Sequence, residues 1–562
     1  MRPDPSGGSL GPAVLPGGRP GRAPHGPVTP GPLTAGARVV VPQESSGPLP
    51  DAWRFCVGTG RLDLALRRDY LDSLALVQRE IGFRHIRGHG LFSDGMGVHR
   101  PYRLDGADAV RYSFTHVDQV IDSYLDLGIR PFLELGFMPS GLASGDRTVF
   151  WWRGNVTPPR SWTAWADLVK ATLAHLVDRY GLEEVRRWPV EVWNEPNLAD
   201  FWDGDEQAYH QLYDVTARAV KEVDADLQVG GPAVSPGDDA WLGRFAEAVA
   251  RLGSPLDFVS RHAYSAGPAQ HVPFGTFQTL RPASALLEQF ADPRRRLQGT
   301  PYAGLPVHVT EFNSSYRPDN AVHDTALHAA YLAPVLARGG DLVDSFAYWT
   351  FCDVFEEQNV PTTFFHGGFG LLTHRQVRKP TYHLYAFLAR MGRHVLARGD
   401  DHLVTRDGEG RVTVLAWAPV DVTGDGSGGP AAGGSTVRLS VPVAPDGDAV
   451  REAFLLRSSV GEEEGNAYAA WRALGRPPSP TSRQLDVLQR SSEPARRHTR
   501  LPVVGGRADV DVVLGPHEVT LLEITPVMDH TPSWWDEGRV LGRAPGAGSG
   551  GPGRGAGGGD QE

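Results

Sequence analysis

The sequence predicts an α/β fold, a (β/α)8 TIM barrel followed by a C-terminal β-sandwich domain that carries a helical insert. Two observations lead to this prediction. Between about residues 53 and 392, short apolar segments alternate with amphipathic segments, as in a barrel of parallel strands covered by helices. After about residue 398, strand-like segments are separated by Gly, Pro and Asp turns, which is typical of a sandwich. A doubly wound open sheet is the rival, but no GxGxxG motif opens a helix after the first strand.

The predicted barrel strands are mostly continuous apolar runs, as expected for parallel strands that are buried on both faces. They cover residues 55–59, 83–88, 131–136, 190–194, 228–231, 258–263, 307–311 and 345–350. Segments with helical periodicity fall between and after them, at residues 69–81, 116–127, 162–179, 206–223, 240–251, 322–337 and 382–391. The barrel is therefore placed at residues 53–395.

The C-terminal domain is placed at residues 396–535. Its strands are predicted at residues 402–405, 412–418, 436–443, 452–456, 508–513 and 518–524. A helical pattern at 467–488 interrupts them and defines an insert at 463–495. An early strand at 38–41, within the segment 37–52, has no partner in the barrel. We expect it to pair with the sandwich and tie the two domains together.

Both ends of the chain are low in complexity. Residues 1–36 hold 9 Gly and 9 Pro, and residues 536–562 form a Gly-rich tail. Neither segment can bury enough apolar surface to fold, so both are predicted to be disordered. The chain shows no signal-peptide pattern and no run of 18 apolar residues, so a cytoplasmic protein without a membrane partner is expected.

Composition excludes several functional classes. The formal net charge is −11, and no basic stripe with interleaved aromatic residues points to nucleic acid. The two cysteines, Cys56 and Cys352, form neither a disulfide framework nor a zinc knuckle. Cys56 lies on the first strand and Cys352 follows the eighth. These strands close the barrel, so the two residues could be neighbours, and buried free thiols are the state expected in cytoplasm.

Two glutamates stand at the carboxyl ends of predicted barrel strands, where the active sites of such barrels lie. Glu195 follows the fourth strand and Glu311 ends the seventh. A single Glu at a strand end is ordinarily a surface residue, but two that face one barrel mouth form a specific constellation. Glycosidic cleavage needs one protonated carboxyl for the leaving oxygen and one ionised carboxylate. Asn194, beside Glu195, could hold a sugar hydroxyl.

The motifs around these glutamates resemble those of glycoside hydrolase family 39, the β-xylosidases. The first is Val-Trp-Asn-Glu-Pro at residues 192–196, and the second is Val-Thr-Glu-Phe-Asn at 309–313. Further similar segments are 61–67, 86–92, 348–357 and 465–477. The resemblance covers about residues 40–525 and leaves out the two tails.

The resemblance implies roles for individual residues. Glu195 would be the general acid/base and Glu311 the nucleophile. The subsite for the cleaved sugar would be lined by His89, Asn194, His262, Tyr264, Trp349, Glu356 and Glu357. Because Glu356 and Glu357 are adjacent, we expect only one of them to point inward and the other to be solvated.

Other buried polar residues have simpler interpretations. Glu134 and Glu191 lie inside strands, so we expect structural ion pairs below the site, with Arg87 or Arg261 as partner. The histidines in the strands lack a metal-binding spacing such as HExxH, and we predict neither a metal nor another cofactor. The aromatic segment 150–152 could cover the site or contact a partner subunit, so a homo-oligomer stays open.

The reaction implied is retaining hydrolysis by double displacement, which releases terminal β-linked xylose from xylo-oligosaccharides or small glycosides. Retention predicts carboxyl groups about 5–5.5 Å apart, against about 6.5–9.5 Å for inversion. Alternative activities are those of an α-L-iduronidase, an α-L-arabinosidase or a β-glucosidase. An iduronidase needs a cation for the uronate, and no Arg near the eighth strand is identified for it. The alternatives from other functional classes are a non-catalytic carbohydrate-binding barrel and a structural scaffold.

Overall fold

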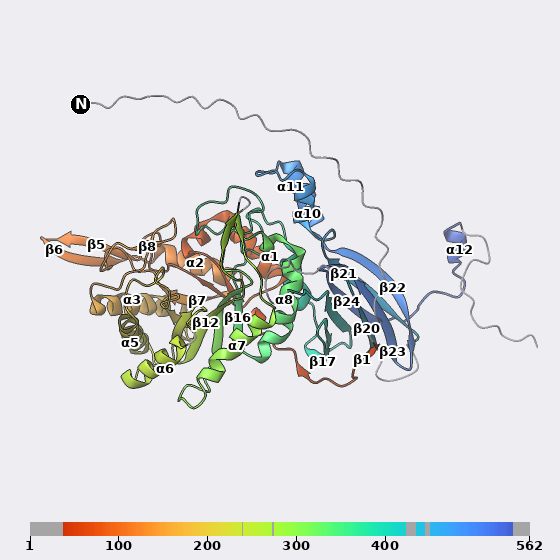
Figure 1. The fold of residues 1–562 in the computed structure, drawn as a ribbon, viewed down its shortest axis with the longest axis horizontal. Coiled ribbons are helices and arrows are strands. Elements are labelled where there is room, and N and C mark those ends of the chain that lie inside the picture. The colour runs from red at the N-terminus through yellow and green to blue at the C-terminus, as the bar shows by residue number, and fades with distance from the viewer. Residues whose placement is uncertain (1–36, 239, 273–274, 423–433, 444–449, 543–562) are drawn as a thin grey trace, which may run out of the picture.

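The computed structural model describes residues 37–238, 240–272, 275–422, 434–443 and 450–542. The predicted arm at 1–36 lies outside the described residues, as does the tail from 543 onward. Two bodies lie side by side, the barrel at one end and a β-rich domain at the other (Figure 1). No helix within the described ranges is long and apolar enough to cross a bilayer.

Eight strands form the predicted closed barrel, and every neighbouring pair described is parallel. In chain order they are β3 (Cys56–Gly58), β4 (His85–Gly88), β7 (Arg130–Leu135), β10 (Val190–Val192), β11 (Val229–Val234), β12 (Phe258–Tyr264), β15 (Val307–Asn313) and β16 (Ser345–Tyr348). These strands are buried almost throughout, which explains why they appear as continuous apolar runs. The predicted fold class is confirmed.

Helices cover the outside of the barrel (Figure 1). They are α1 (Arg68–Glu80), α2 (Thr115–Asp126), α3 (Trp162–Tyr180), α4 (Leu182–Val185), α5 (Glu206–Val223), α6 (Trp241–Leu252), α7 (Ser284–Arg296), α8 (Ala326–Arg338) and α9 (Pro380–Ala389). Helix α7 is not among the expected helices. Pro293 lies inside it and three arginines end it, so its apolar face is weakly marked in the sequence.

Three hairpins extend the loops at the carboxyl ends of the barrel strands. They pair β5 (His99–Leu104) with β6 (Ala107–Tyr112), β8 (Thr148–Val149) with β9 (Gly154–Asn155), and β13 (Gln270–Val272) with β14 (Gly275–Phe277). The β5–β6 ribbon projects from the body of the barrel (Figure 1). The β8–β9 hairpin matters for the site described below, because it carries the aromatic segment 150–152.

The C-terminal domain folds two halves of a mostly antiparallel sheet over one apolar core. Val414, Leu439 and Val510, from three different strands, are fully or almost fully buried in that core. The strands are β17 (His394–Arg398), β18 (His402–Arg406), β19 (Val412–Trp417), β20 (Ser435–Pro442), β21 (Glu452–Val460), β22 (Ala495–Val504), β23 (Arg507–Leu514) and β24 (Val519–Pro526). Strand β22 is absent from the prediction because its sequence is largely polar and exposed.

The beginning of the described chain belongs to this second domain. Strand β1 (Val39–Val40) pairs in parallel with β20, and β2 (Gly47–Pro48) pairs with β17. The helical insert consists of α10 (Ala467–Ala473) and α11 (Ser482–Ser491), between β21 and β22. Where a tail without structure was expected, residues 537–540 form the single helical turn α12 (Glu537–Val540).

The sandwich also packs directly on the barrel. Trp417 and Val519 belong to the same apolar cluster as the barrel helices, and both are almost fully buried. The insert reaches further and places Trp471 against Phe365, in the loop that follows β16. The second domain therefore supports the loop after the eighth barrel strand, which contributes to the candidate site.

Candidate active site

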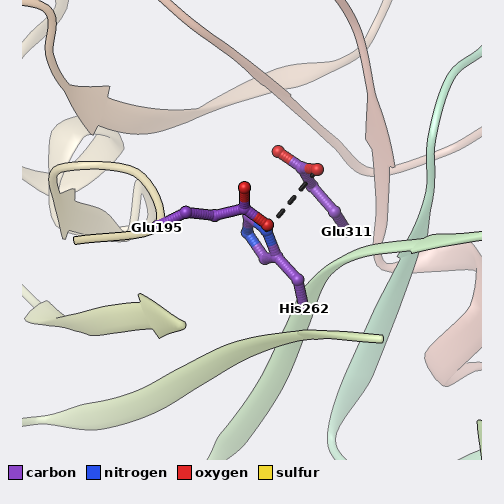
Figure 2. Close-up of side chains that lie close together, drawn as sticks. All are labelled: Glu195, His262 and Glu311. Atoms are coloured by element: carbon purple, nitrogen blue, oxygen red, sulfur yellow. Dashed lines mark hydrogen bonds and ion pairs between the residues drawn. The ribbon is translucent and has the colours of Figure 1, made fainter. Parts of the chain in front are cut away.

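Glu195 and Glu311 face one another at the mouth of the barrel, and His262 lies between their strands (Figure 2). Glu195 follows β10 with a φ of 44°, in the left-handed region that is uncommon for residues other than glycine. Glu311 lies on β15, in register with His262 on β12. The two carboxylates that are 116 positions apart in sequence thus meet at the carboxyl ends of their strands, as barrel topology requires.

The two carboxyl groups are close. One oxygen of Glu195, one oxygen of Glu311 and a ring nitrogen of His262 lie within 4.8 Å of one another. The Nδ1 atom of His262 is 2.8 Å from Glu195 Oε1 and 3.5 Å from Glu311 Oε2. This close approach of the two carboxyl groups favours the short separation of retaining enzymes over the longer one of inverting enzymes. The three side chains could also hold a cation, but their mutual contacts already account for the arrangement.

Glu311 is held by two strong donors. The Arg87 guanidinium donates from Nη1 to Glu311 Oε1 at 2.7 Å, and the Tyr264 hydroxyl donates to Oε2 at 2.7 Å. Arg87 is fully buried and is also paired with Glu134 at 2.9 Å and with Glu191 at 2.5 Å. Burial opposes its charge, but these carboxylates outweigh burial and raise the pKa of Arg87. A permanent cation and a hydroxyl donor thus face Glu311, as an ionised nucleophile requires.

Glu195 has the opposite environment. Its side chain is buried, and loss of hydration raises the pKa of Glu195 to about 7. Burial also lowers the pKa of neighbouring His262 to about 4, so that imidazole is neutral near pH 7 and adds no positive charge. Glu195 can therefore hold a proton at neutral pH beside the carboxyl group that Arg87 and Tyr264 contact. Two carboxyl groups whose environments differ in this way are suited to acid and nucleophile roles.

The predicted subsite residues gather around this pair. Arg87 donates to Asn194 Oδ1 at 3.0 Å, which leaves the Asn194 amide hydrogens as donors. His89 binds Glu134 Oε2 through Nδ1 at 2.7 Å, and its Nε2 is 3.6 Å from Glu311 Oε1. Burial alone would lower the pKa of His89, but Glu134 and Glu311 raise it. Tyr264 binds Glu311, as described above.

Trp349 forms a wall beside these residues. Its indole lies 4.8 Å from the His89 ring, measured between centroids, and the side chain is 2% exposed. Gly58 on β3 makes room for it, because a Cβ atom there would lie 2.3 Å from the indole. A side chain at position 58 would therefore displace the indole from the site.

Glu356 and Glu357 take different positions. Glu356 is paired with Arg61 at 2.8 Å and with Arg67 at 2.5 Å, so both of its oxygens are engaged. Glu357 Oε1 is 3.9 Å from His89 Nε2, and burial raises the pKa of Glu357 to about 8. The expectation that one of them is solvated is wrong, because their side chains are 8% and 14% exposed.

The expected ion pairs of Glu134 and Glu191 are present, and Arg87 is their partner, at 2.9 Å from Glu134 and 2.5 Å from Glu191. The other arginine considered, Arg261, pairs with Asp292 at 3.0 Å. Arg87 also reaches Glu311, and its role is therefore not confined to ion pairs below the site. The only signal in the sequence was an inward-facing arginine in a barrel strand. Phe150 stacks on His89 at 6.2 Å between centroids, so the aromatic segment covers part of this site.

The two cysteines are buried free thiols in different parts of the barrel. Cys56 lies in a small apolar cluster with Phe132 and Phe258, whereas Cys352 belongs to the main core. Burial raises the pKa of both thiols, which makes them poor nucleophiles. Neither takes part in the candidate site.

Comparison with known proteins identifies the same family that the sequence motifs resemble. The model of the family described as Glycosyl hydrolases family 39 matches residues 37–508. A β-xylosidase of Geobacillus stearothermophilus is 46% identical over 508 residues, which cover 89% of this chain and 98% of the relative. A β-xylosidase of Caldicellulosiruptor saccharolyticus is 34% identical and covers 84% and 95%. The crystal structure of a monomeric β-xylosidase from Caulobacter crescentus superposes with a TM-score of 0.79 at 35% identity, covering 88% and 100%.

Proposed function

Because this chain belongs to glycosyl hydrolases family 39, we propose that it removes terminal β-linked xylose from short xylo-oligosaccharides with retention of configuration. The observation that carries the proposal is the pair Glu195 and Glu311. Their oxygens approach within 4.8 Å, one carboxyl group in a desolvating environment and the other between a guanidinium and a hydroxyl.

The reaction proceeds in two displacements. Glu311 attacks the anomeric carbon while protonated Glu195 gives its proton to the departing glycosidic oxygen. This forms an ester between the sugar and Glu311. Glu195, now ionised, takes a proton from water, which attacks the same carbon and releases the sugar and Glu311. Two inversions give net retention.

The surrounding side chains are suited to hold one sugar ring. The free Asn194 amide is a donor for a hydroxyl next to the anomeric carbon, and Trp349 offers an aromatic face. Glu357 holds a proton near pH 7, since burial raises its pKa to about 8, and it can donate to a neutral hydroxyl. His89 lies between Glu134 and Glu311, because its Nδ1 is bonded to Glu134 and its Nε2 faces Glu311.

The charges in the pocket support a neutral sugar. A uronate would need a free cation. Arg87 already faces three carboxylates, and Arg61 and Arg67 both bind Glu356. Together with the named activity of the two relatives, this favours xylose over iduronate. Arabinose and glucose remain competing neutral sugars.

A panel of aryl glycosides tests the proposal. Wild-type protein, Glu311→Ala and the control Glu452→Ala, an exposed residue of the sandwich, are assayed on β-xyloside, β-glucoside, α-L-arabinoside and α-L-iduronide. We expect the highest kcat/KM on the β-xyloside and its loss in Glu311→Ala alone. Activity that survives Glu311→Ala refutes the nucleophile assignment, and inactivity of the wild type on every glycoside favours a binding protein.

We also propose that the protein acts in the cytoplasm. The support is chemical, because two buried free thiols suit a reducing compartment. Cell fractionation followed by immunodetection of the full chain tests it, and recovery outside the cytoplasmic fraction contradicts it.

A further inference from the structure

A second cavity lies at the barrel mouth, apart from the two catalytic glutamates. Its volume is about 620 Å³, which is within the usual range for small-molecule sites. It is lined by segments that follow the first three barrel strands, around Asp63, Ser93 and the β8–β9 hairpin. It therefore opens on the same face of the barrel as the candidate active site, displaced toward β3, β4 and β7.

Aromatic side chains separate this cavity from the catalytic residues. Trp152 lines the cavity and stacks on Phe150 at 5.4 Å between centroids, and Phe150 in turn stacks on His89. The backbone N–H of Trp151 donates to the carbonyl of Glu357 at 3.2 Å, which ties this wall to the loop after β16. The cavity is thus a neighbour of the catalytic pocket with a wall of its own.

The polar lining of the cavity has unused hydrogen-bonding capacity. The Ser93 hydroxyl is buried and finds no hydrogen-bond partner among the described residues. The side chains of Asp146 and Arg153 make no hydrogen bond or ion pair with described residues. A buried hydroxyl that lacks a partner is costly unless a ligand or water satisfies it. Together these groups offer both donors and acceptors, as binding of sugar hydroxyls requires.

Two indoles provide an apolar platform beside these polar groups. The Arg61 guanidinium lies 5.4 Å from the Trp151 ring centroid and 5.9 Å from that of Trp152, so it fixes both rings. Trp151 remains 45% exposed, which is unusual for so large an apolar side chain. Its surface is available to stack on a ligand ring.

The charges of the cavity select against anions. The Arg61 charge is engaged by Glu356 and Asp63, at 2.8 and 3.0 Å. Of the charged lining residues, Arg153 is then the cation left beside the carboxylates of Asp94 and Asp146. A net negative lining disfavours phosphates, nucleic acids and uronates, whereas carboxylates readily accept hydrogen bonds from neutral hydroxyls.

We propose that this cavity is a second, non-catalytic binding site for a neutral oligosaccharide of two or three pyranose units, of the β-xylo type. The choice of sugar rests on the proposed function. Trp151 is the stacking platform, Ser93 and Asp146 bind hydroxyls, and the wall of Phe150 and Trp152 keeps the bound chain away from Glu311. The site holds substrate chains beside the catalytic pocket and does not cleave them.

The test is a calorimetric titration with xylotriose after the catalytic pocket is closed. An activated 2-deoxy-2-fluoro-β-xyloside blocks the pocket covalently, and intact mass reports the labelling. We expect the blocked protein to bind xylotriose still. In blocked Trp151→Ala the affinity should fall about tenfold or more, the factor that corresponds to about 1.4 kcal/mol. Asp146→Ala is the second variant, in case Trp151→Ala fails to fold.

Trp534→Ala is the matched control, since Trp534 is 77% exposed and does not line the cavity. It should bind xylotriose as the parent does. Absence of binding to the blocked protein, or equal binding by Asp146→Ala, Trp151→Ala and Trp534→Ala, overturns the proposal. If no label forms, the proposed function fails instead, and the same titration of the unlabelled proteins, with product analysis to show that xylotriose stays intact, decides on the cavity.

Discussion

Glu195 and Glu311 have the same side chain in two different surroundings. Burial outweighs the opposing charges of His89 and Arg87 and favours the protonated form of Glu195, whereas Arg87 and Tyr264 both donate to Glu311. In the proposed mechanism their environments, more than their positions alone, divide the acid and nucleophile roles. In that mechanism the fully buried network of Arg87, Glu134 and Glu191 supports the nucleophile, because it holds the cation that faces Glu311.

The raised pKa of Glu195 predicts an alkaline limit to activity. The first step needs the protonated acid, so kcat/KM on an unactivated xyloside should fall as the pH rises through about 7. In Glu195→Gln, assayed on an activated aryl xyloside that needs no acid, kcat/KM should lose this limb. A pH–rate profile for both proteins checks it. If the alkaline fall in kcat/KM persists in Glu195→Gln, the titrating group is instead Glu357, because burial raises the pKa of Glu357 to about 8.

Some positions in the site could be predicted from the sequence, whereas some side-chain contacts could not. The two glutamates follow from strand position, because strand ends of one barrel meet at one mouth. The different fates of Glu356 and Glu357 could not be predicted, since the arginines that bind Glu356 come from a loop almost 300 positions earlier. The reach of Arg87 to Glu311 likewise depends on a side-chain network formed only in the folded barrel.

At the scale of elements, the loop after β16 is fixed by a buried charge cluster. Lys379 is fully buried and pairs with Asp324 and Asp353, each at 2.7 Å. The same aspartates accept the backbone N–H groups of Gly367 and Gly370 at 2.7 Å. This cluster links both ends of the loop that carries Glu356 and Glu357, and the helical insert packs on the same loop through Trp471.

Removing the central cation should be strongly destabilising. Lys379→Met leaves two buried carboxylates without their partner, which should cost about 3–5 kcal/mol in the free energy of unfolding. The control Arg490→Met breaks an exposed helical pair with Asp486 and should cost about 0.3–0.5 kcal/mol. Denaturant titration of both variants measures the difference. Equal, small losses would show that the cluster does not stabilise the loop.

Strands and helices could be predicted where their burial gives the sequence a regular arrangement of apolar residues. Continuous apolar strands mark the barrel, whereas β22 and α7 carry polar or proline-containing sequences whose structure depends on neighbouring elements. The pairing of β1 with β20 is a contact between segments 400 positions apart. The only indication of this pairing in the sequence is that the strand expected at residues 38–41 has no partner in the barrel.

At the scale of the whole molecule, one face of the sandwich packs into the apolar cluster of the barrel, while the sandwich interior forms a cluster of its own. Trp417 and Val519 of the sandwich are in the barrel's cluster, and Arg390 after α9 pairs with Glu523 on β24. Neither body can separate without exposing large apolar side chains to water. The second domain also contributes the insert that supports the loop after β16.

This apolar contact between the two domains predicts a single unfolding transition. Differential scanning calorimetry of the full chain should give one peak whose calorimetric and van't Hoff enthalpies agree. Two resolved peaks would mean that the domains unfold independently, contrary to the packing described.

In the proposed mechanism Glu311 becomes covalently bound to the sugar during turnover. Peptide mapping by mass spectrometry, after inactivation with an activated 2-deoxy-2-fluoro-β-xyloside, tests this bond. We predict that one fluoroxylosyl group is attached per chain, on the peptide that contains Glu311 and at that residue. A label on Glu195 or Glu357, or turnover of β-xylosides without any trapped label, would contradict the account.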